Sequence, residues 1–302
     1  MKEYVIAVRS YRRPQMFLDL TYSLLLLQDG LNLKKQLYIF VADAEEKSLY
    51  EKTLAEREYC EIVVAVKGLR EVTSFMTRFF PEETCILFLD DDLKSFFEFQ
   101  GIPDKGNLVK RSGRLHDYVL FALEKMSELS LTGFTFRNAK NPFYLQGKPF
   151  AETAPFLMSG GYFGVLRNIS EMIEVSFGHD EDVDRSCKFF QKDKSIFLFN
   201  WAGFDTVLGT LPGGMADSGD RDSQEKKRED FTKHVCEELI KKDHIRPFAD
   251  GIVWRDHGFF DIQLQRSHTI RKKLNARHVV YPGYFETQGS VKSEPIVRRT
   301  LF

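Results

Sequence analysis

Residues 85–93 read CILFLDDDL, in which five apolar residues lead without interruption into the carboxylates Asp90, Asp91 and Asp92. An apolar run of this length with no polar alternation is typical of a strand that is buried on both faces, as in a parallel sheet. Three adjacent carboxylates repel one another unless a cation neutralises them. The stretch therefore predicts a central strand whose carboxyl end carries concentrated negative charge.

Similar apolar runs occur three times upstream, and helical patterns separate the four runs. The expected strands cover residues 4–9, 37–42, 61–66 and 85–89. The expected helices cover residues 15–27, 45–58 and 69–80. This alternation of strands and helices predicts an α/β fold with a mostly parallel sheet and flanking helices.

The pattern continues downstream, with helices expected over 111–129, 168–175 and 179–190 and strands over 131–136, 156–167 and 196–200. Residues 209–224 concentrate turn-forming residue types and predict a loop or hinge. A charged helix is expected over 225–242, and residues 255–302 carry a surplus of Lys and Arg over Asp and Glu. We therefore divide the chain into an α/β core, residues 1–208, and a C-terminal region, residues 209–302, that ends in a basic extension.

Polar residues follow several of the apolar runs, at the points where the strands are expected to end. They are Arg9 to Arg13, Asp43 and Asp90 to Asp92. Because ligands of such sheets bind outside the carboxyl ends of the strands, these residues are expected to converge on one edge. Alternation along an extended segment places Asp90 and Asp92 on one side, so they are the better pair of metal ligands. Mg²⁺ and Mn²⁺ prefer carboxylate oxygens and often keep a substrate phosphate as a further ligand.

The alternative for the three aspartates is a solvated acidic turn that caps a helix over residues 93–97. Such a turn would need no ligand.

Composition and charge exclude some classes of protein. The formal net charge is −1, so a nucleic-acid partner would have to be held by a local basic surface. The four cysteines lack CxxC spacing, which favours reduced thiols over a disulfide framework or a zinc site. The longest aliphatic run, Leu24 to Leu27, is far below the roughly 20 apolar residues of a membrane span. We expect a cytoplasmic protein with no membrane partner, no signal peptide and no obligate protein partner.

The apolar strand followed by Asp90-Asp91-Asp92 resembles the DxD motif of GT-A-fold glycosyltransferases, and the opening Arg9-Ser10-Tyr11-Arg12-Arg13-Pro14 resembles their first nucleotide-contacting loop. The resemblance implies a GT-A-like, Rossmann-like fold and a metal, Mn²⁺ or Mg²⁺, that bridges the phosphates of a nucleotide-sugar, with UDP as the expected nucleotide. Asp90 and Asp92 would hold the metal, and a C-terminal histidine, His257 or His268, would add a ligand. The residues implied in nucleotide-sugar binding are Arg9, Ser10, Arg12, Arg13, Asp43, Asp90, Asp91, Gly160 and Gly161. The competing interpretations are a helix-capping turn for Asp43 and surface arginines for the loop.

Gly160-Gly161 and Glu181-Asp182 resemble two further features of these enzymes: a small-residue strand near the donor sugar and an acidic helix start on the acceptor side. Glycine in a strand permits close backbone approach. A carboxylate is stabilised as an anion at a helix N-terminus, which suits a base that accepts a proton from the acceptor hydroxyl. Asp182 is the candidate catalytic base and Glu181 the second choice, provided that the enzyme inverts. The alternative is that these acids merely cap the helix.

The opening loop, the DDD, the EDVD at residues 181–184 and the loop Gly213-Gly214-Met215 together resemble the TET/JBP-associated glycosyltransferases. That resemblance implies transfer of a hexose or pentose to 5-hydroxymethylpyrimidine, or its glycosylated form, in double-stranded DNA. For a phage protein the compartment would be the host cytoplasm.

Closely spaced cations in the C-terminal region form a candidate DNA-binding segment, because they would neutralise several phosphates. They are Arg266, Arg271, Lys272, Lys273 and Arg277. The alternative is a surface segment that balances acidic residues elsewhere. Two other functions stay open: a transferase for a polysaccharide, glycolipid or protein acceptor, and a non-catalytic nucleic-acid-binding module.

Overall fold

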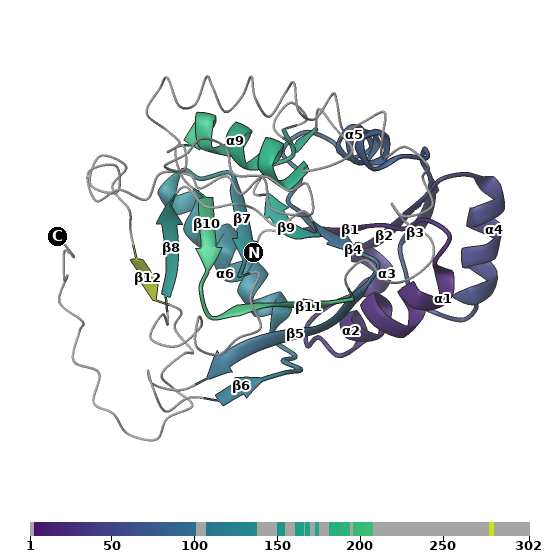
Figure 1. Ribbon diagram of the computed structural model, residues 1–302, viewed down its shortest axis with the longest axis horizontal. Coiled ribbons are helices and arrows are strands. Elements are labelled where there is room, and N and C mark those ends of the chain that lie inside the picture. The colour runs from purple at the N-terminus through teal and green to yellow at the C-terminus, as the bar shows by residue number, and fades with distance from the viewer. Residues whose placement is uncertain are drawn as a thin grey trace, which may run out of the picture.

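The computed structural model describes residues 3–100, 107–137, 150–154, 161–165, 167–169, 173–174, 181–193, 196–207 and 278–280. These residues form a nine-stranded sheet with helices on both faces and a second sheet of three strands (Figure 1). The predicted α/β class is therefore confirmed. Most of the predicted C-terminal region lies outside the described residues, but its strand β12 (His278–Val280) pairs with the edge of the first sheet.

The large sheet has the strand order β12-β8-β10-β7-β9-β4-β1-β2-β3. Its other strands are β1 (Val5–Arg9), β2 (Leu37–Val41), β3 (Glu61–Val64), β4 (Ile86–Asp90), β7 (Gly133–Phe136), β8 (Phe150–Ala154), β9 (Tyr162–Val165) and β10 (Ile196–Phe199). Strands β8 and β9 run antiparallel to both of their neighbours, while the remaining pairs are parallel. All strands of this sheet except β8 and β9 therefore run in the same direction, and the sheet of the described residues is mostly parallel, as predicted.

The order β3-β2-β1-β4 contains a topological switch point. The chain steps outward from β1 to β2 and β3, then returns to the other side of β1 as β4. In open α/β sheets the ligand crevice lies at such a point, outside the carboxyl ends of the two diverging strands. The last residues of β1 and β4, Arg9 and Asp90, are paired in register. Topology alone therefore brings these two side chains to the position where a ligand is expected.

The described residues include most of the predicted helices, with some limits changed, and one short helix that was not predicted. They are α1 (Pro14–Phe17), a π-helical turn η1 (Leu18–Tyr22), α2 (Ser23–Leu26), α3 (Leu33–Gln36), α4 (Ala44–Thr53), α5 (Leu69–Phe79), α6 (Leu115–Leu129) and α9 (Glu181–Asp193). The first three are consecutive and make up the helix expected over 15–27. Helix α6 begins four residues later than expected. The helix expected over 168–175 lies largely outside the described residues.

The sheet is covered on both faces by apolar side chains. Along β4, Leu87 and Leu89 contribute to one hydrophobic cluster, while Ile86 and Phe88 contribute to another. The first cluster includes residues of η1, α2 and α6, and the second includes residues of α5 and α9. Because successive side chains of a strand point to opposite faces, a strand covered in this way is apolar at every position.

The chain after the three aspartates is a strand, and the helix considered over 93–97 is wrong. Strand β5 (Leu93–Gln100) pairs antiparallel with β6 (Asn107–Val109) and with β11 (Ala202–Thr206) in the second sheet. Its main partner lies about a hundred residues away, so no local pattern reveals the pairing. Asp91 and Asp92 therefore form the turn at which the chain passes from the large sheet into the small one.

A buried carboxylate ties the second sheet to α6. Glu98 of β5 is buried and accepts hydrogen bonds from Tyr118 Oη at 2.5 Å and Ser112 Oγ at 2.9 Å. Trp201, which precedes β11, donates from Nε1 to Tyr118 Oη at 2.7 Å. Buried polar groups of this kind stabilise a fold only when their hydrogen bonds are made. The network thus anchors the small sheet beside the turn.

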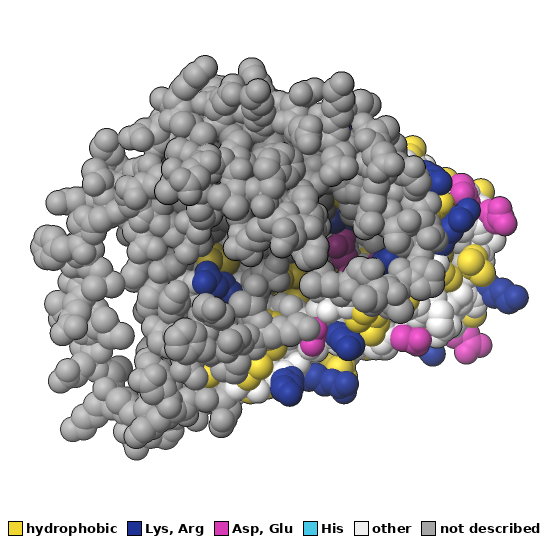
Figure 2. All heavy atoms as spheres, in the orientation of Figure 1, with side chains coloured by type: hydrophobic (Ala, Val, Ile, Leu, Met, Phe, Trp, Pro, Cys, Tyr) yellow, Lys and Arg dark blue, Asp and Glu magenta, His cyan; other side chains and the backbone are white. Residues whose placement is uncertain are grey.

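The outer surface near α4 mixes acidic and basic side chains (Figure 2). Among the described residues, no helix combines the length and the apolar character that crossing a lipid bilayer requires.

Candidate functional site

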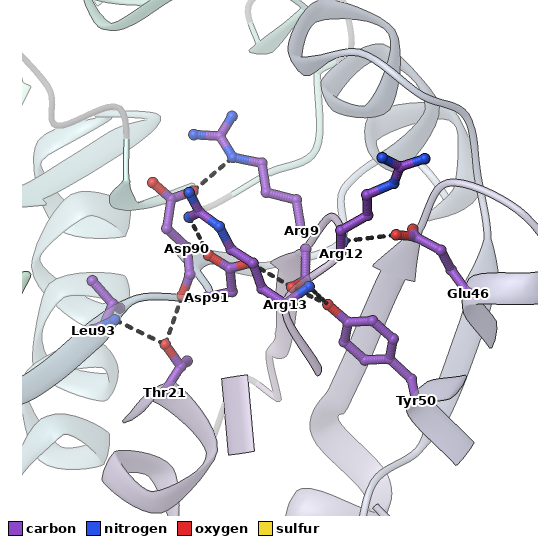
Figure 3. Close-up of polar contacts among 10 residues, drawn as sticks. Arg9, Arg12, Arg13, Thr21, Glu46, Tyr50, Asp90, Asp91 and Leu93 are labelled. Atoms are coloured by element: carbon purple, nitrogen blue, oxygen red, sulfur yellow. Dashed lines mark hydrogen bonds and ion pairs between the residues drawn. The ribbon is translucent and has the colours of Figure 1, made fainter. Parts of the chain in front are cut away.

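The switch point is occupied by an ion pair. Arg9 Nε lies 2.7 Å from Asp90 Oδ1 (Figure 3). Arg9 Nη1 donates to Thr73 Oγ1 of α5 at 3.2 Å. Asp90 keeps about a third of its side-chain surface accessible, at 31%. The carboxylate is therefore held in one orientation by a guanidinium and still faces solvent.

Asp91 lies among a different set of partners from Asp90. It accepts hydrogen bonds from Ser10 Oγ and, at 3.4 Å, from Arg13 Nη1. Ser10 Oγ also shares a hydrogen bond of 2.5 Å with Tyr50 Oη of α4. Asp91 is buried, at 6% exposure. It is thus a structural anchor for the loop after β1, while Asp90 is the more accessible of the two.

The loop after β1 takes its shape from α4. Arg12 has a left-handed backbone, with φ +56°, which is uncommon for a residue with a side chain. Its backbone N–H donates to Glu46 Oε1 at 2.7 Å, and Glu46 Oε2 accepts from Ala42 N at 2.9 Å. Tyr50 Oη accepts from Arg13 N at 3.3 Å. These contacts bring Arg9, Ser10 and Arg13 to the aspartates, as the sequence predicted.

Glu46 and Tyr50 are site residues that the sequence analysis missed. For Glu46 a signal was present, since Asp43 and Glu46 have the spacing of a capping box at a helix start. Asp43 is the N-cap of α4, and its side chain accepts from Glu46 N at 2.9 Å. The capping interpretation of Asp43 is thus confirmed, and its predicted contact with a nucleoside stays a prediction.

Among the described residues, the three carboxylates outnumber the arginines that pair with them, Arg9 and Arg13. Burial, and secondly the charge of Asp90, raises the pKa of Asp92 to about 7. Burial is also the main reason that the pKa of Asp91 is raised, to about 6, although the hydrogen bond from Ser10 opposes the rise. The described residues therefore neutralise the negative charge of the turn only in part.

The donor set suits a hard divalent cation. Mg²⁺ is usually bound through one or two protein carboxylates, with phosphate and water oxygens completing its shell. Within the described part of the chain, no three His, Cys, Asp or Glu side chains converge as a full metal cage. Asp90 and Asp92 would thus supply two ligands and leave the remaining positions to a substrate phosphate and water.

These pKa shifts predict an unusual pH dependence of stability. The folded carboxyls bind protons more tightly than the unfolded ones, so the free energy of unfolding falls as pH rises from about 4 to 7. We expect the Tm of the metal-free protein to be higher at pH 5.5 than at pH 7.5. Mn²⁺ should raise Tm more at pH 7.5, because protons compete with the metal for Asp92. Thermal denaturation in EDTA and in Mn²⁺ at the two pH values measures both effects. A metal-free Tm that is no higher at pH 5.5 would contradict the first expectation, and an equal rise of Tm with Mn²⁺ at both pH values would contradict the second.

Gly161 lies against Asp90. Its carbonyl oxygen accepts from Asp90 N at 2.8 Å, and a Cβ at this position would lie 2.6 Å from Asp90 Oδ2. The close approach expected of this glycine is therefore made to the carboxylate. Gly160 lies outside the described residues, and the contact of either glycine with a donor sugar stays a prediction.

Gly161→Ala is expected to displace the Asp90 carboxylate and so to weaken Mn²⁺ binding by about 10-fold, the size of effect found for groups that orient metal ligands. Gly133→Ala at the start of β7 provides a comparison with another sheet glycine. The fold of Gly161→Ala should survive, because the atom that the new methyl group meets, Asp90 Oδ2, lies at the end of a side chain that can rotate. Titration with Mn²⁺ checks this, and an unchanged affinity would show that Asp90 tolerates the new methyl group.

Helix α9 reaches the same corner through Arg185. It begins at Glu181, two residues later than expected, and Asp182 is half-buried with its carbonyl oxygen accepting from Ser186 Oγ. Arg185, one turn later, is fully buried with its guanidinium 4.1 Å from the centre of the Phe163 ring. Arg185 lines a small cavity together with Arg9 and Asp90. This buried arginine was not singled out from the sequence, although it directly follows the EDVD segment.

Several predicted site residues lie outside the described residues: His257, His268, Arg266, Arg271, Lys272, Lys273 and Arg277. The side chain of Glu181 also lies outside them. Their roles in metal binding, DNA binding and catalysis remain predictions.

The sequence matches no protein-family model and no curated protein. Among solved structures, the chain is similar to S. aureus TarS residues 1–349, at 13% identity and a TM-score of 0.41, over 68% of this chain and 59% of that one. The same TarS fragment in complex with UDP-GlcNAc matches at 12% identity and a TM-score of 0.46, over 72% of this chain and 61% of that one. This chain thus spans about three fifths of the TarS fragment. Because the TM-scores are below 0.5, the functional proposal is based on the site itself.

Proposed function

We propose that this protein is a metal-dependent glycosyltransferase that uses a nucleotide-sugar, with UDP as the first nucleotide to test. One observation carries the proposal: Asp90, Asp91 and Asp92 lie at the topological switch point, where Arg9 and Arg13 meet them. A site that combines carboxylates for a divalent cation with guanidiniums for phosphate oxygens suits a diphosphate ligand. A solvated helix-capping turn would not need the arginines, and no helix follows this turn.

The proposed roles follow from the contacts. Asp90 and Asp92 would hold Mn²⁺ or Mg²⁺, which supplies positive charge for the diphosphate and for the leaving nucleotide. Arg9 and Arg13 are held in place by Asp90 and Asp91, so their guanidiniums are oriented before the donor arrives. Preoriented charge costs little reorganisation during the reaction. Asp182, at the start of α9, would accept the proton of the acceptor hydroxyl.

For the acceptor we propose a 5-hydroxymethylpyrimidine, or its glycosylated form, in double-stranded DNA. The support is the basic sequence segment from Arg266 to Arg277, whose cations would bind phosphates without reading the base sequence. A hydroxymethyl group on C5 of a pyrimidine projects into the major groove, so an enzyme can reach it there. Polysaccharide, glycolipid and protein acceptors are the alternatives.

The test incubates the full chain with single UDP-sugars and with either hydroxymethylated or unmodified DNA, in Mn²⁺ or in EDTA. Mass spectrometry of the digested nucleosides reports the sugar and the acceptor together. We expect a hexose or pentose mass on the modified base only, and only with the metal. Metal-dependent hydrolysis of the donor without DNA modification would support the transferase and reject this acceptor. Donor turnover in excess EDTA would reject the metal, and no donor binding at all would reject the transferase.

A further inference from the structure

The helix after β1 contains a π-helical turn. Residues Leu18–Tyr22 form η1 between α1 and α2, and Ser23 Oγ donates to the Leu18 carbonyl, five residues earlier, at 2.8 Å. π-helical turns are rare, and where they occur inside α-helices they are often found at functional sites. This one directly precedes α2, whose Leu24 and Leu25 are part of the hydrophobic core.

One residue of this turn, Thr21, reaches the aspartates. Its side chain is fully buried, and Oγ1 donates to the Asp90 carbonyl oxygen at 2.8 Å (Figure 3). Thr21 Oγ1 also accepts a hydrogen bond from Leu93 N at 3.0 Å. A threonine hydroxyl has one proton and two lone pairs, so these two bonds use it in both directions. Thr21 thus closes the turn by joining the residue before Asp91 to the residue after Asp92.

Thr21 bonds two backbone groups, the Asp90 carbonyl and the Leu93 N–H. Both lie where the chain leaves the large sheet and enters the small one. Asp90 ends β4 in the large sheet, and Leu93 begins β5 in the small one. The carbonyl of Asp92 is separately bonded by Val207 N at 3.1 Å. Buried backbone groups that lose their hydrogen-bond partner destabilise the local structure, so loss of the hydroxyl is expected to make the turn rearrange. A rearranged turn would change the direction in which Asp90 and Asp92 point.

We propose that Thr21 is a positioning residue for the divalent metal site of Asp90 and Asp92. It acts through the backbone of the turn and does not contact the metal or the donor. The inference rests on the proposed function, because it takes these two carboxylates as the metal ligands. It adds that η1, through Thr21, helps to fix their geometry.

The test replaces Thr21 by valine, which keeps the shape and removes the hydroxyl. Electron paramagnetic resonance of free Mn²⁺, in the presence of saturating UDP, gives the metal affinity without any turnover. We expect Thr21→Val to raise the Kd for Mn²⁺ by about 10-fold or more, as is common for groups that orient metal ligands. Thr21→Ser, which restores a hydroxyl, should recover most of the affinity.

Thr77→Val is the matched control. Thr77 is also buried, but its Oγ1 donates within α5, to the Ser74 carbonyl at 2.9 Å. Its replacement should lower Tm to a similar degree and leave the Mn²⁺ affinity within about 2-fold. Should Thr21→Val fail to fold, Thr21→Ala makes the same comparison with a smaller side chain.

The outcomes separate the two claims. Normal Mn²⁺ binding by the folded Thr21→Val protein would overturn the role of Thr21 and leave the metal site intact. Weakened binding in both Thr21→Val and Thr77→Val would also overturn it, because a general loss of stability would then explain the effect. Wild-type protein that binds no divalent cation would instead reject the metal site itself.

Discussion

Asp92→Asn is expected to abolish metal-dependent donor binding while it makes the metal-free protein more stable. The loss follows because asparagine removes one of the two anionic ligands proposed for the cation, and we expect kcat/KM to fall by at least about 100-fold, beyond the 10–100-fold typical of groups that only orient ligands. The gain follows because burial and the charge of Asp90 raise the pKa of Asp92 to about 7. Its ionisation therefore opposes folding at pH 8, and a neutral amide removes that penalty.

This combination distinguishes the substitution from ordinary damage to the fold. Calorimetry with a UDP-sugar and Mn²⁺ measures binding, and thermal denaturation in EDTA at pH 8 measures stability. Asp90→Asn should also lose binding, but it additionally breaks the ion pair with Arg9. Asp117→Asn, at an exposed carboxylate on α6, is the control and should change neither property. Wild-type donor affinity in Asp92→Asn would remove the basis for the metal site.

Asp182→Asn is expected to slow sugar transfer by about 10²–10⁴-fold, the contribution usual for a general base, with donor affinity unchanged. Asp182 lies at the second position of α9, whereas the carboxylates that we propose for the donor site follow the carboxyl end of β4. Removal of the carboxylate should therefore affect the proton transfer from the acceptor and not the binding of the nucleotide. Single-turnover rates together with calorimetric donor affinity separate these two effects.

Glu181→Gln is the comparison, because Glu181 is the other candidate base. A slower rate in Glu181→Gln with normal turnover in Asp182→Asn would reassign the base to Glu181. Nuclear magnetic resonance of the product gives the anomeric configuration. An inverted product is consistent with a base on the acceptor side, and a retained one would reject this role for both residues.

The buried Arg185 connects α9 with the strand β4 that ends in Asp90. Its guanidinium packs on Phe163 of β9, and Phe163 stacks on Phe88 of β4 with the ring centres 4.6 Å apart. Phe88 lies two residues before Asp90 and therefore on the same face of the strand. A continuous set of contacts thus connects Arg185 of α9 with the end of β4.

The strands of the first half were predictable because each is buried on both faces, and continuous burial produces an apolar run that can be read locally. The edge on which Arg9 and Asp90 meet was predictable for a related reason, since parallel strands with helical crossovers end on the same side. The charge at the end of β4 and the capping of α4 by Asp43 are also local properties.

Only the tertiary structure decides that the neighbouring carboxylates Asp90 and Asp91 have different partners. Asp90 pairs with Arg9, whereas Asp91 pairs with Ser10 and Arg13, because strand alternation ends at Asp90 and a turn begins. The strand β5 was mistaken for a possible helix because its partner β11 is contributed by a distant segment. Thr21 could not be singled out either, since a threonine within a helical pattern looks the same whether or not its hydroxyl closes a turn 70 residues away. Apolar periodicity extends over a few neighbouring residues, so it can be recognised in the sequence. Hydrogen bonds between distant segments form only when the chain has folded.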